Sequence, residues 1–148
     1  MGIRPAEPAD LAAVEEIVAK AYTPWIAVMA MKPIPMVADY GRLIADERVS
    51  VLENGEIDAI IVLIPEQGAL LVDNVAVRPD RQGRGLGRRL MTFAEHQART
   101  LGLGSLRLYT NEKMLSNIAL YTSLGYLETG RELLNGRSVV LMRKDLQS

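Results

Sequence analysis

Residues 75–90 read VAVRPDRQGRGLGRRL. The apolar run that ends at Val77 predicts a β-strand, and the apolar spacing that follows predicts a helix, so a glycine-rich turn leads from the strand into the helix. Gly83, Gly85 and Gly87 let the backbone approach a ligand closely. The N–H groups of the first helical turn point toward the same place, with the positive end of the helix dipole behind them. This turn is therefore predicted to bind an anion such as phosphate.

Positive charge is concentrated at this turn. Residues 78–89 hold five arginines and one aspartate, a net charge of +4, while the whole chain carries −1, so the rest of the chain sums to −5. The crowded arginines repel one another, which a turn that only starts a solvated helix has no reason to accept. The charge therefore favours a turn that binds an anionic ligand. The turn lacks the Gly-Lys-Ser/Thr of a nucleoside-triphosphate loop, and its Gly-x-Gly-x-Gly spacing differs from that of dinucleotide-binding proteins. Both of those ligand classes are excluded.

The first half of the chain has helical patterns followed by strands. Residues 10–22 have helical spacing, with Asp10 as a candidate cap. Residues 23–40 contain three prolines and many apolar side chains, which predicts a broken helical segment or flap that either covers the core or contacts substrate. Residues 48–77 form three apolar runs, the first two joined by Asn54-Gly55, and predict an antiparallel meander.

The second half alternates between the two patterns. Residues 86–101 predict a helix, residues 106–108 a short strand and residues 114–124 a second helix. Two further strands flank Asn135-Gly136 as a hairpin. We therefore predict one α/β domain over residues 1–148, with a mixed, mostly antiparallel central sheet of six to seven strands and flanking helices.

Composition narrows the function. The chain has 148 residues, 49% apolar and 24% charged, which is typical of one globular domain. It has no cysteine and one histidine, His96, so it lacks a thiol nucleophile and the ligands for a cysteine or imidazole metal site, and we expect no metal. No apolar run approaches the ~18 residues of a membrane span, and the arginines are not interleaved with aromatics. We expect a cytoplasmic protein that binds neither membranes nor nucleic acid.

Two motifs together resemble a known family. Gln82-Gly-Arg-Gly-Leu-Gly87 matches the Q/R-x-x-G-x-G/A motif of the GNAT (Gcn5-related) N-acetyltransferases. Asn117-Ile-Ala-Leu-Tyr121-Thr-Ser-Leu-Gly125-Tyr126 is similar to the second signature of that family, in the right order and at the right separation. The resemblance implies the acyl-CoA N-acyltransferase fold. It also implies transfer of an acetyl group from acetyl-CoA to a primary amine, by direct attack through a tetrahedral intermediate.

The resemblance also implies where the coenzyme lies. The pantetheine pairs with the strand that ends at Val77, which requires a splayed sheet with an unpaired edge there. The pyrophosphate rests on the glycine turn, and Arg81 or Arg84 could meet the 3′-phosphate. The implied coenzyme contacts are Val75, Ala76, Val77, Gln82, Gly83, Arg84, Gly85, Leu86, Gly87, Arg88, Asn117 and Tyr121.

Three catalytic tasks follow from the implied reaction. A backbone N–H near residues 75–77 would stabilise the oxyanion, and Tyr121 matches the family tyrosine that protonates the leaving thiolate. Asp73 lies inside an apolar strand, where strict alternation would put it on the face of Leu71, Val75 and Val77. It is our candidate for the general base or the anchor of the substrate cation; the alternative is an acid paired with an arginine. Glu66, Tyr109, Glu112 and a water chain are reserve candidates for the base.

The sequence says less about where the amine acceptor binds than about the coenzyme. The family places the acceptor opposite the coenzyme, between the early helical segment and the C-terminal hairpin. The predicted walls are Trp25, Met29, Met36, Tyr40 and the strand of residues 126–134. The acceptor would be an amine of a small molecule or a peptide. The alternative function is a regulatory module that binds acetyl-CoA without turnover. A homodimer could form through the apolar C-terminal hairpin.

Overall fold

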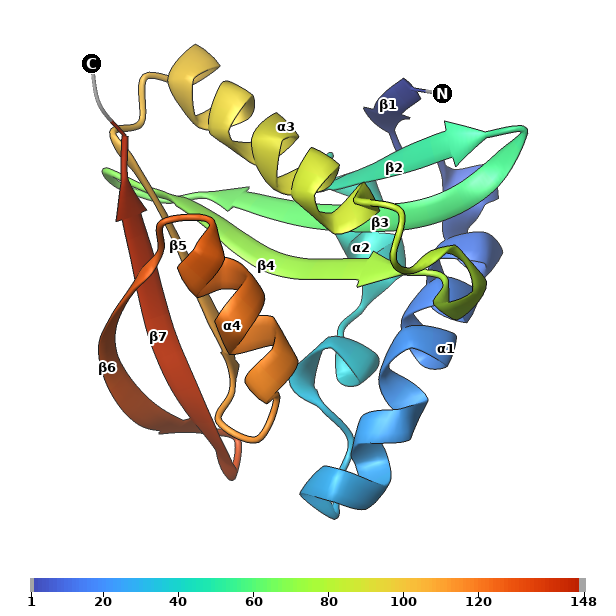
Figure 1. The fold of residues 1–148 in the computed structure, drawn as a ribbon. Coiled ribbons are helices and arrows are strands. Elements are labelled where there is room, and N and C mark those ends of the chain that lie inside the picture. The colour runs from blue at the N-terminus through green and yellow to red at the C-terminus, as the bar shows by residue number, and fades with distance from the viewer. Residues whose placement is uncertain (1, 147–148) are drawn as a thin grey trace.

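Seven strands form one sheet in a computed structural model that describes residues 2–146 (Figure 1). Their order across the sheet is β1-β2-β3-β4-β5-β7-β6, and every neighbouring pair is antiparallel except β4 and β5. The mixed, mostly antiparallel sheet is confirmed. The strands are β1 Gly2–Pro5, β2 Val49–Asn54, β3 Glu56–Pro65, β4 Leu70–Val77, β5 Ser105–Asn111, β6 Leu127–Leu134 and β7 Arg137–Asp145.

Helices cover both faces of the sheet. On one face, α3 (Leu86–Thr100) and α4 (Leu115–Ser123) pack over a core that includes Leu90 and Leu106. On the other face, α1 (Leu11–Met29) and α2 (Tyr40–Ala45) pack over a second core. Three short 3-10 turns complete the elements: η1 Pro8–Asp10, η2 Ile34–Val37 and η3 Pro79–Arg81. Within residues 2–146, none of the helices combines the length and the apolar character needed to cross a bilayer.

The sheet splits between β4 and β5. These two strands pair only where Leu70–Val72 meets Leu106–Leu108, and Figure 1 shows them diverging beyond that point. The edge of β4 from residue 73 to residue 77 is therefore open on the β5 side, while its other edge pairs with β3. The predicted unpaired edge beside Val75 and Val77 is confirmed.

A β-bulge at Asp73 corrects the predicted alternation of β4. Val62 of β3 pairs with Asn74 and Leu63 pairs with Val72, so Asp73 is an extra residue in the ladder. One extra residue in a strand moves the side chains that follow it to the opposite face of the sheet from the one that strict alternation predicts. Val72 and Val75 consequently pack on the same face of the sheet, with α3, although strict alternation put them on opposite faces.

Helix α1 is longer than predicted. It continues through Pro24 to Met29, although the prolines of residues 23–40 predicted a break there. Proline removes one backbone hydrogen bond, but Thr23 and Pro24 lie on the exposed side, and the Thr23 hydroxyl bonds the carbonyl of Ala19. Asp10 begins the helix as predicted, yet its carboxylate accepts bonds from Glu7 N–H and from Arg4 instead of capping α1.

Two elements were not predicted. Strand β1 has only four residues, too few for a visible period. Helix α2 could have been found, because Tyr40 and Ile44 have helical spacing and Asp39 precedes them; the Asp39 carboxylate accepts a hydrogen bond from Arg42 N–H at 3.1 Å. The flap prediction holds for the residues around η2, which are irregular.

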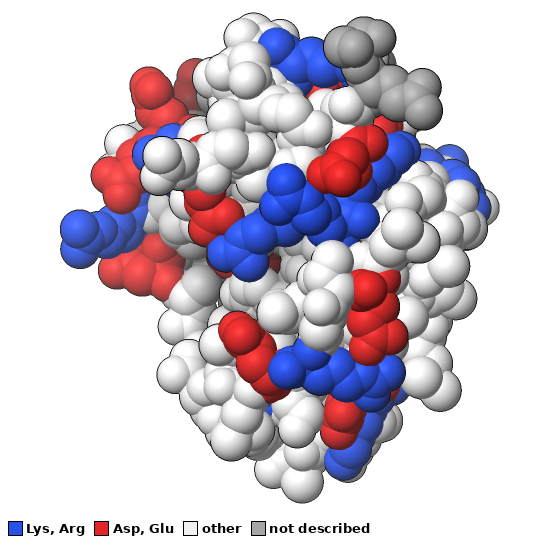
Figure 2. All heavy atoms as spheres, turned by 90° about the vertical axis from the view of Figure 1, so that its left-hand side faces the viewer, with Lys and Arg blue, Asp and Glu red and all other residues white. Residues whose placement is uncertain are grey.

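The sheet edge formed by β6 and β7 carries both signs of charge. Figure 2 looks at this side of the molecule and shows basic and acidic residues interspersed over it. Ion pairs on these strands include Arg131–Glu128 at 2.6 Å and Arg143–Asp145 at 2.9 Å. The charges of Arg131 and Arg143 are therefore matched locally by carboxylates.

Candidate active site

An outer groove of about 370 Å³ lies beside the open edge of β4. It is bounded by that edge, the glycine turn, α1 and α4. All of the predicted coenzyme contacts line it except Arg84, which is exposed beside it. Groove-lining residues outside the predicted coenzyme set are Ala21, Tyr22, Trp25, Arg81, Ser116 and Leu120.

The glycine turn has the conformation that an anion site needs. Gly83 and Gly85 have φ values of +82° and +77°, in the left-handed region that favours glycine, and a Cβ at either would meet no atom within 4 Å. Gly85 is the N-cap of α3, so the first N–H groups of that helix are unpaired at the groove. The Gln82 side chain donates to the Val77 carbonyl at 3.4 Å and ties the turn to the strand.

The charge of the turn is smaller than the local sequence suggested. Arg81 lies 3.0 Å from Glu56 and 3.4 Å from buried Asp58, and Arg78 lies 3.2 Å from Glu56. Both acids come from β3, which the sequence count did not include. Arg88, which donates to the Ser123 hydroxyl at 3.2 Å, lines the groove and is better placed for an anion.

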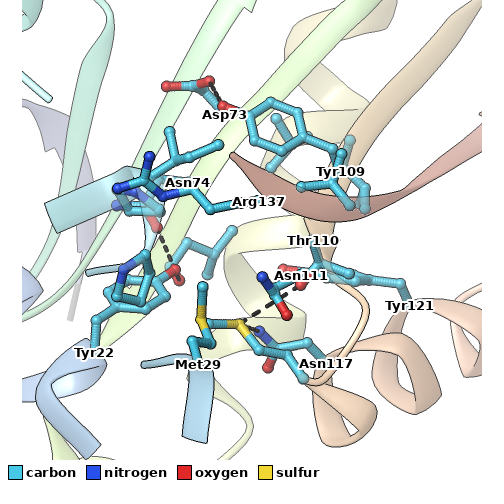
Figure 3. A pocket seen from close by; sticks show the side chains of 18 residues that line it. Tyr22, Met29, Asp73, Asn74, Tyr109, Thr110, Asn111, Asn117, Tyr121 and Arg137 are labelled. Carbon is cyan, nitrogen blue, oxygen red and sulfur yellow. Dashed lines mark hydrogen bonds between the residues drawn. The ribbon is translucent and has the colours of Figure 1, made fainter. Parts of the chain in front are cut away.

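A second, inner cavity of about 40 Å³ opens where β4 and β5 diverge (Figure 3). The inner cavity is therefore much smaller than the outer groove. Tyr22, Val75, Asn117 and Tyr121 line both the groove and the cavity. The other cavity residues are Met29, Pro33, Ile34, Pro35, Val72, Asp73, Asn74, Leu108, Tyr109, Thr110, Asn111, Met114, Arg137 and Val139.

Asp73 is half-buried in the inner cavity and accepts a 3.0 Å hydrogen bond from the hydroxyl of Tyr109. Burial raises the pKa of the Asp73 carboxyl above its ordinary value, against the lowering effects of that hydrogen bond and of the Arg107 charge. Burial and the charge of Asp73 raise the pKa of Tyr109 as well. At neutral pH the Tyr109 hydroxyl thus keeps its proton and donates the hydrogen bond, and the Asp73 carboxylate is more basic than usual.

Tyr121 stands at the junction of groove and cavity. Burial raises the pKa of its phenol to about 12. Its ring meets that of Tyr126 edge to face, with centroids 6.0 Å apart. Among residues 2–146, no group forms a hydrogen bond with its hydroxyl, which leaves that hydroxyl available to a ligand.

A buried polar chain that the sequence did not reveal supports the cavity wall. The Tyr22 hydroxyl donates to the Asn74 side-chain oxygen at 2.5 Å and lies 3.1 Å from the Val75 carbonyl. The Asn74 amide donates to the Tyr40 hydroxyl at 2.9 Å, which donates to the Pro35 carbonyl at 2.6 Å. The chain joins α1, β4, α2 and the flap. The only sequence signal was Asn74 itself, a polar residue inside an apolar strand.

The predicted acceptor walls are only partly assembled, and none of residues 126–134 is among the residues that line the inner cavity. Met29 lines the inner cavity, but Trp25 lines the groove. Met36 and Tyr40 line a separate depression beside α1, and Tyr40 reaches the site only through Asn74. Of the reserve bases, Glu66 is paired with Arg107 at 2.5 Å and Glu112 lies 3.5 Å from Arg131, both outside the cavity lining. His96 is exposed on α3.

Comparison with known proteins agrees with this architecture. Over 87 residues the chain is 36% identical to the [ribosomal protein bS18]-alanine N-acetyltransferase of Salmonella typhimurium, an alignment that covers 59% of this chain and 53% of that protein. The chain thus spans about half the length of this relative. The structure of the ribosomal-protein-S18-alanine N-acetyltransferase from Escherichia coli matches with a TM-score of 0.76 at 22% identity, over 99% of this chain and 94% of that one.

A second solved structure is yncA from Salmonella typhimurium with its cofactor acetyl-CoA. It matches with a TM-score of 0.74 at 24% identity, over 100% of this chain and 95% of that one. These likenesses establish the fold. A model of the acetyltransferase (GNAT) domain matches residues 45–128, more than half of the chain and all of β2 to α4. This chain belongs to the GNAT acetyltransferase family and has its acyl-CoA N-acyltransferase fold.

Proposed function

We propose that this protein transfers the acetyl group of acetyl-CoA to a primary amine, by direct attack of the amine on the thioester. One observation carries the proposal: the outer groove and the inner cavity share the wall formed by Tyr22, Val75, Asn117 and Tyr121. A ligand held by the glycine turn and a ligand beside Asp73 would meet there. Holding two reactants in one place is what makes such a transfer fast.

The groove suits the coenzyme. The open edge of β4 offers backbone groups to an extended chain, as in β-augmentation, and the start of α3 offers N–H groups to a diphosphate. The Val75 carbonyl lies 3.1 Å from the Tyr22 hydroxyl, but a carbonyl has two lone pairs and can accept a second bond. Arg88 supplies positive charge beside the turn.

Asp73 is suited to the amine. A primary amine arrives mostly as an ammonium and must lose a proton before it can attack. The Asp73 carboxylate, with its raised pKa, would first attract the ammonium and then accept its proton, directly or through water. Tyr109 holds this carboxylate at the cavity wall. A backbone N–H of the open β4 edge would stabilise the oxyanion that forms as the amine attacks.

Tyr121 is suited to the leaving thiolate, in a role narrower than the sequence suggested. An unperturbed phenol has a pKa near ~10 and a thiol one near ~8.5. With its pKa raised to about 12, Tyr121 keeps its proton in most encounters with a thiolate. It would therefore stabilise the thiolate by donating a hydrogen bond more than by giving up the proton.

Turnover tests the proposal. The purified protein is mixed with acetyl-CoA and a panel of primary amines, and free thiol is followed. We expect thiol release that depends on an amine, with an acetylated amine as the second product. Coenzyme binding without thiol release from any amine would support the non-catalytic module instead. Formation of a homodimer through the hairpin stays a prediction; it would rest on the exposed Leu127 and Leu133 of β6.

A further inference from the structure

Two opposite charges line the inner cavity. Among residues 2–146, Asp73 and Arg137 are its only lining residues with charged side chains at neutral pH. Asp73 comes from β4, and Arg137 is the first residue of β7. The charged nitrogen and oxygen atoms of these two residues are not within 4.0 Å of each other, so the residues form no ion pair. A small cavity with a carboxylate and a guanidinium held apart is complementary to a molecule that carries both charges.

Arg137 is held in place by neutral groups. Its guanidinium donates from Nε and Nη2 to the Lys32 carbonyl, at 2.9 and 2.8 Å, and from Nη1 to the Asn135 carbonyl at 2.7 Å. A guanidinium has five N–H bonds, so one on each terminal nitrogen remains. These N–H groups are left to donate hydrogen bonds to a ligand carboxylate.

The charge of Arg137 is not balanced locally. The neighbouring basic residues of the β6–β7 hairpin have carboxylate partners, such as Glu128 for Arg131 and Asp145 for Arg143. In the part of the chain that the structure describes, Arg137 has no carboxylate within 4.0 Å. A ligand carboxylate would supply the counter-ion that the described residues do not provide.

The positions of the two charges would also orient a bound molecule that carries both an ammonium and a carboxylate. Asp73 lies two residues before Val75, which lines the junction with the groove, so the ammonium end would face the thioester. Arg137 lies against Lys32, at the flap end of the cavity, together with Pro33 and Pro35. The carboxylate end would therefore point away from the reaction.

We propose that the acceptor is a slender amino acid in its zwitterionic form, with its ammonium at Asp73 and its carboxylate on Arg137. This inference rests on the proposed function, because it names the acceptor of that same site. It excludes, as the preferred acceptor, a simple alkylamine or an amine on a peptide or amide that lacks a nearby carboxylate.

Matched acceptors test this assignment. Glycine, β-alanine and γ-aminobutyrate are compared with methylamine, ethylamine and propylamine, each pair differing by one carboxylate. Glycinamide serves as an analogue of glycine in which an uncharged amide replaces the carboxylate. We expect at least one amino acid to exceed its paired amine, and glycine to exceed glycinamide if glycine is accepted, by roughly 10- to 100-fold in kcat/KM, the usual worth of a charged hydrogen bond. Equal or better use of the compounds that lack a carboxylate would overturn the assignment.

A variant separates recognition from structure. Arg137→Gln also loosens the flap, so the readout is the ratio of kcat/KM for the best amino acid to that for its paired amine. Loss of structure lowers both values together, whereas loss of recognition lowers the ratio, which we expect to fall at least tenfold. The control Arg131→Gln, on the same hairpin but outside the cavity, should leave the ratio unchanged.

The outcomes distinguish the two proposals. If no amine of any kind is acetylated, the proposed function fails. If amines are acetylated without preference for a carboxylate, or the Arg137→Gln ratio equals that of the unsubstituted protein, only the acceptor assignment fails.

Discussion

The Tyr109 hydroxyl donates a 3.0 Å hydrogen bond to the Asp73 carboxylate across the gap where β4 and β5 separate. This bond lowers the pKa of Asp73, partly offsetting the effect of burial. In Tyr109→Phe the pKa of Asp73 should therefore rise further. If the carboxylate must be ionised to accept a proton, the acid limb of the kcat/KM profile will move to higher pH. An acid limb that stays in place would contradict this role for Asp73.

Asp73→Asn should separate activity from stability. The variant cannot accept a proton, so we expect kcat/KM to fall by roughly 10²- to 10⁴-fold, the usual contribution of a general base. A folded-state pKa above the unfolded value means that the contribution of Asp73 to stability is greatest at low pH and falls as pH rises through the two values. At pH 7 the ionised, half-buried Asp73 carboxylate destabilises the folded protein. The substitution removes this destabilising effect, so the Tm should stay equal or rise. A lower Tm would show that Asp73 is structural.

Tyr121→Phe removes a hydroxyl and leaves the ring that packs on Tyr126. We expect turnover to fall about 10- to 100-fold, as for a lost hydrogen bond to a charged group, while the Kd for coenzyme A changes less than threefold. Steady-state kinetics and calorimetry measure the two quantities. Unchanged turnover would remove Tyr121 from the mechanism.

Gly85→Ala tests the anion site. Its φ of +77° costs an alanine about 1 kcal/mol, and the added methyl would stand where the diphosphate meets the backbone. We expect coenzyme A to bind at least tenfold more weakly by calorimetry. Gly102→Ala is a matched control, because its φ is +72° and a Cβ there also meets nothing within 4 Å, but it lies at the other end of α3. Equal affinities in the two variants would refute the anion site.

Tyr22→Phe tests the buried polar chain. The Asn74 side-chain oxygen would lose its donor while staying buried, since Asn74 is 5% exposed. We expect the free energy of unfolding to fall by about 1 to 3 kcal/mol in urea titrations. Tyr126→Phe is the control: that hydroxyl is buried among residues 2–146 without a hydrogen-bond partner, so its removal should be neutral or stabilising. If Tyr22→Phe lowers the free energy of unfolding no more than Tyr126→Phe does, the buried polar chain contributes little to stability.

The sequence alone was enough to predict the strand-turn-helix unit and most of the residues that line the outer groove. The conformation of Gly83 and Gly85 and the unpaired N–H groups of α3 depend on residues within a few positions of one another. The hairpin at Asn135-Gly136 was equally local, with φ values of +49° and +77°. Short-range backbone preferences decide such features, and they can be read in order along the chain.

The inner cavity depended on the tertiary structure. The bulge at Asp73 arises from the pairing of β3 with β4, and it reversed the predicted parity of that strand. Tyr22, Asp73 and Arg137 meet only because α1, β4 and β7 surround the gap left by β4 and β5. Glu56 and Asp58 likewise reached Arg81 from another strand. Strand register, sheet splay and charge pairing between distant segments are set by packing of the whole chain, so no local pattern could predict this cavity.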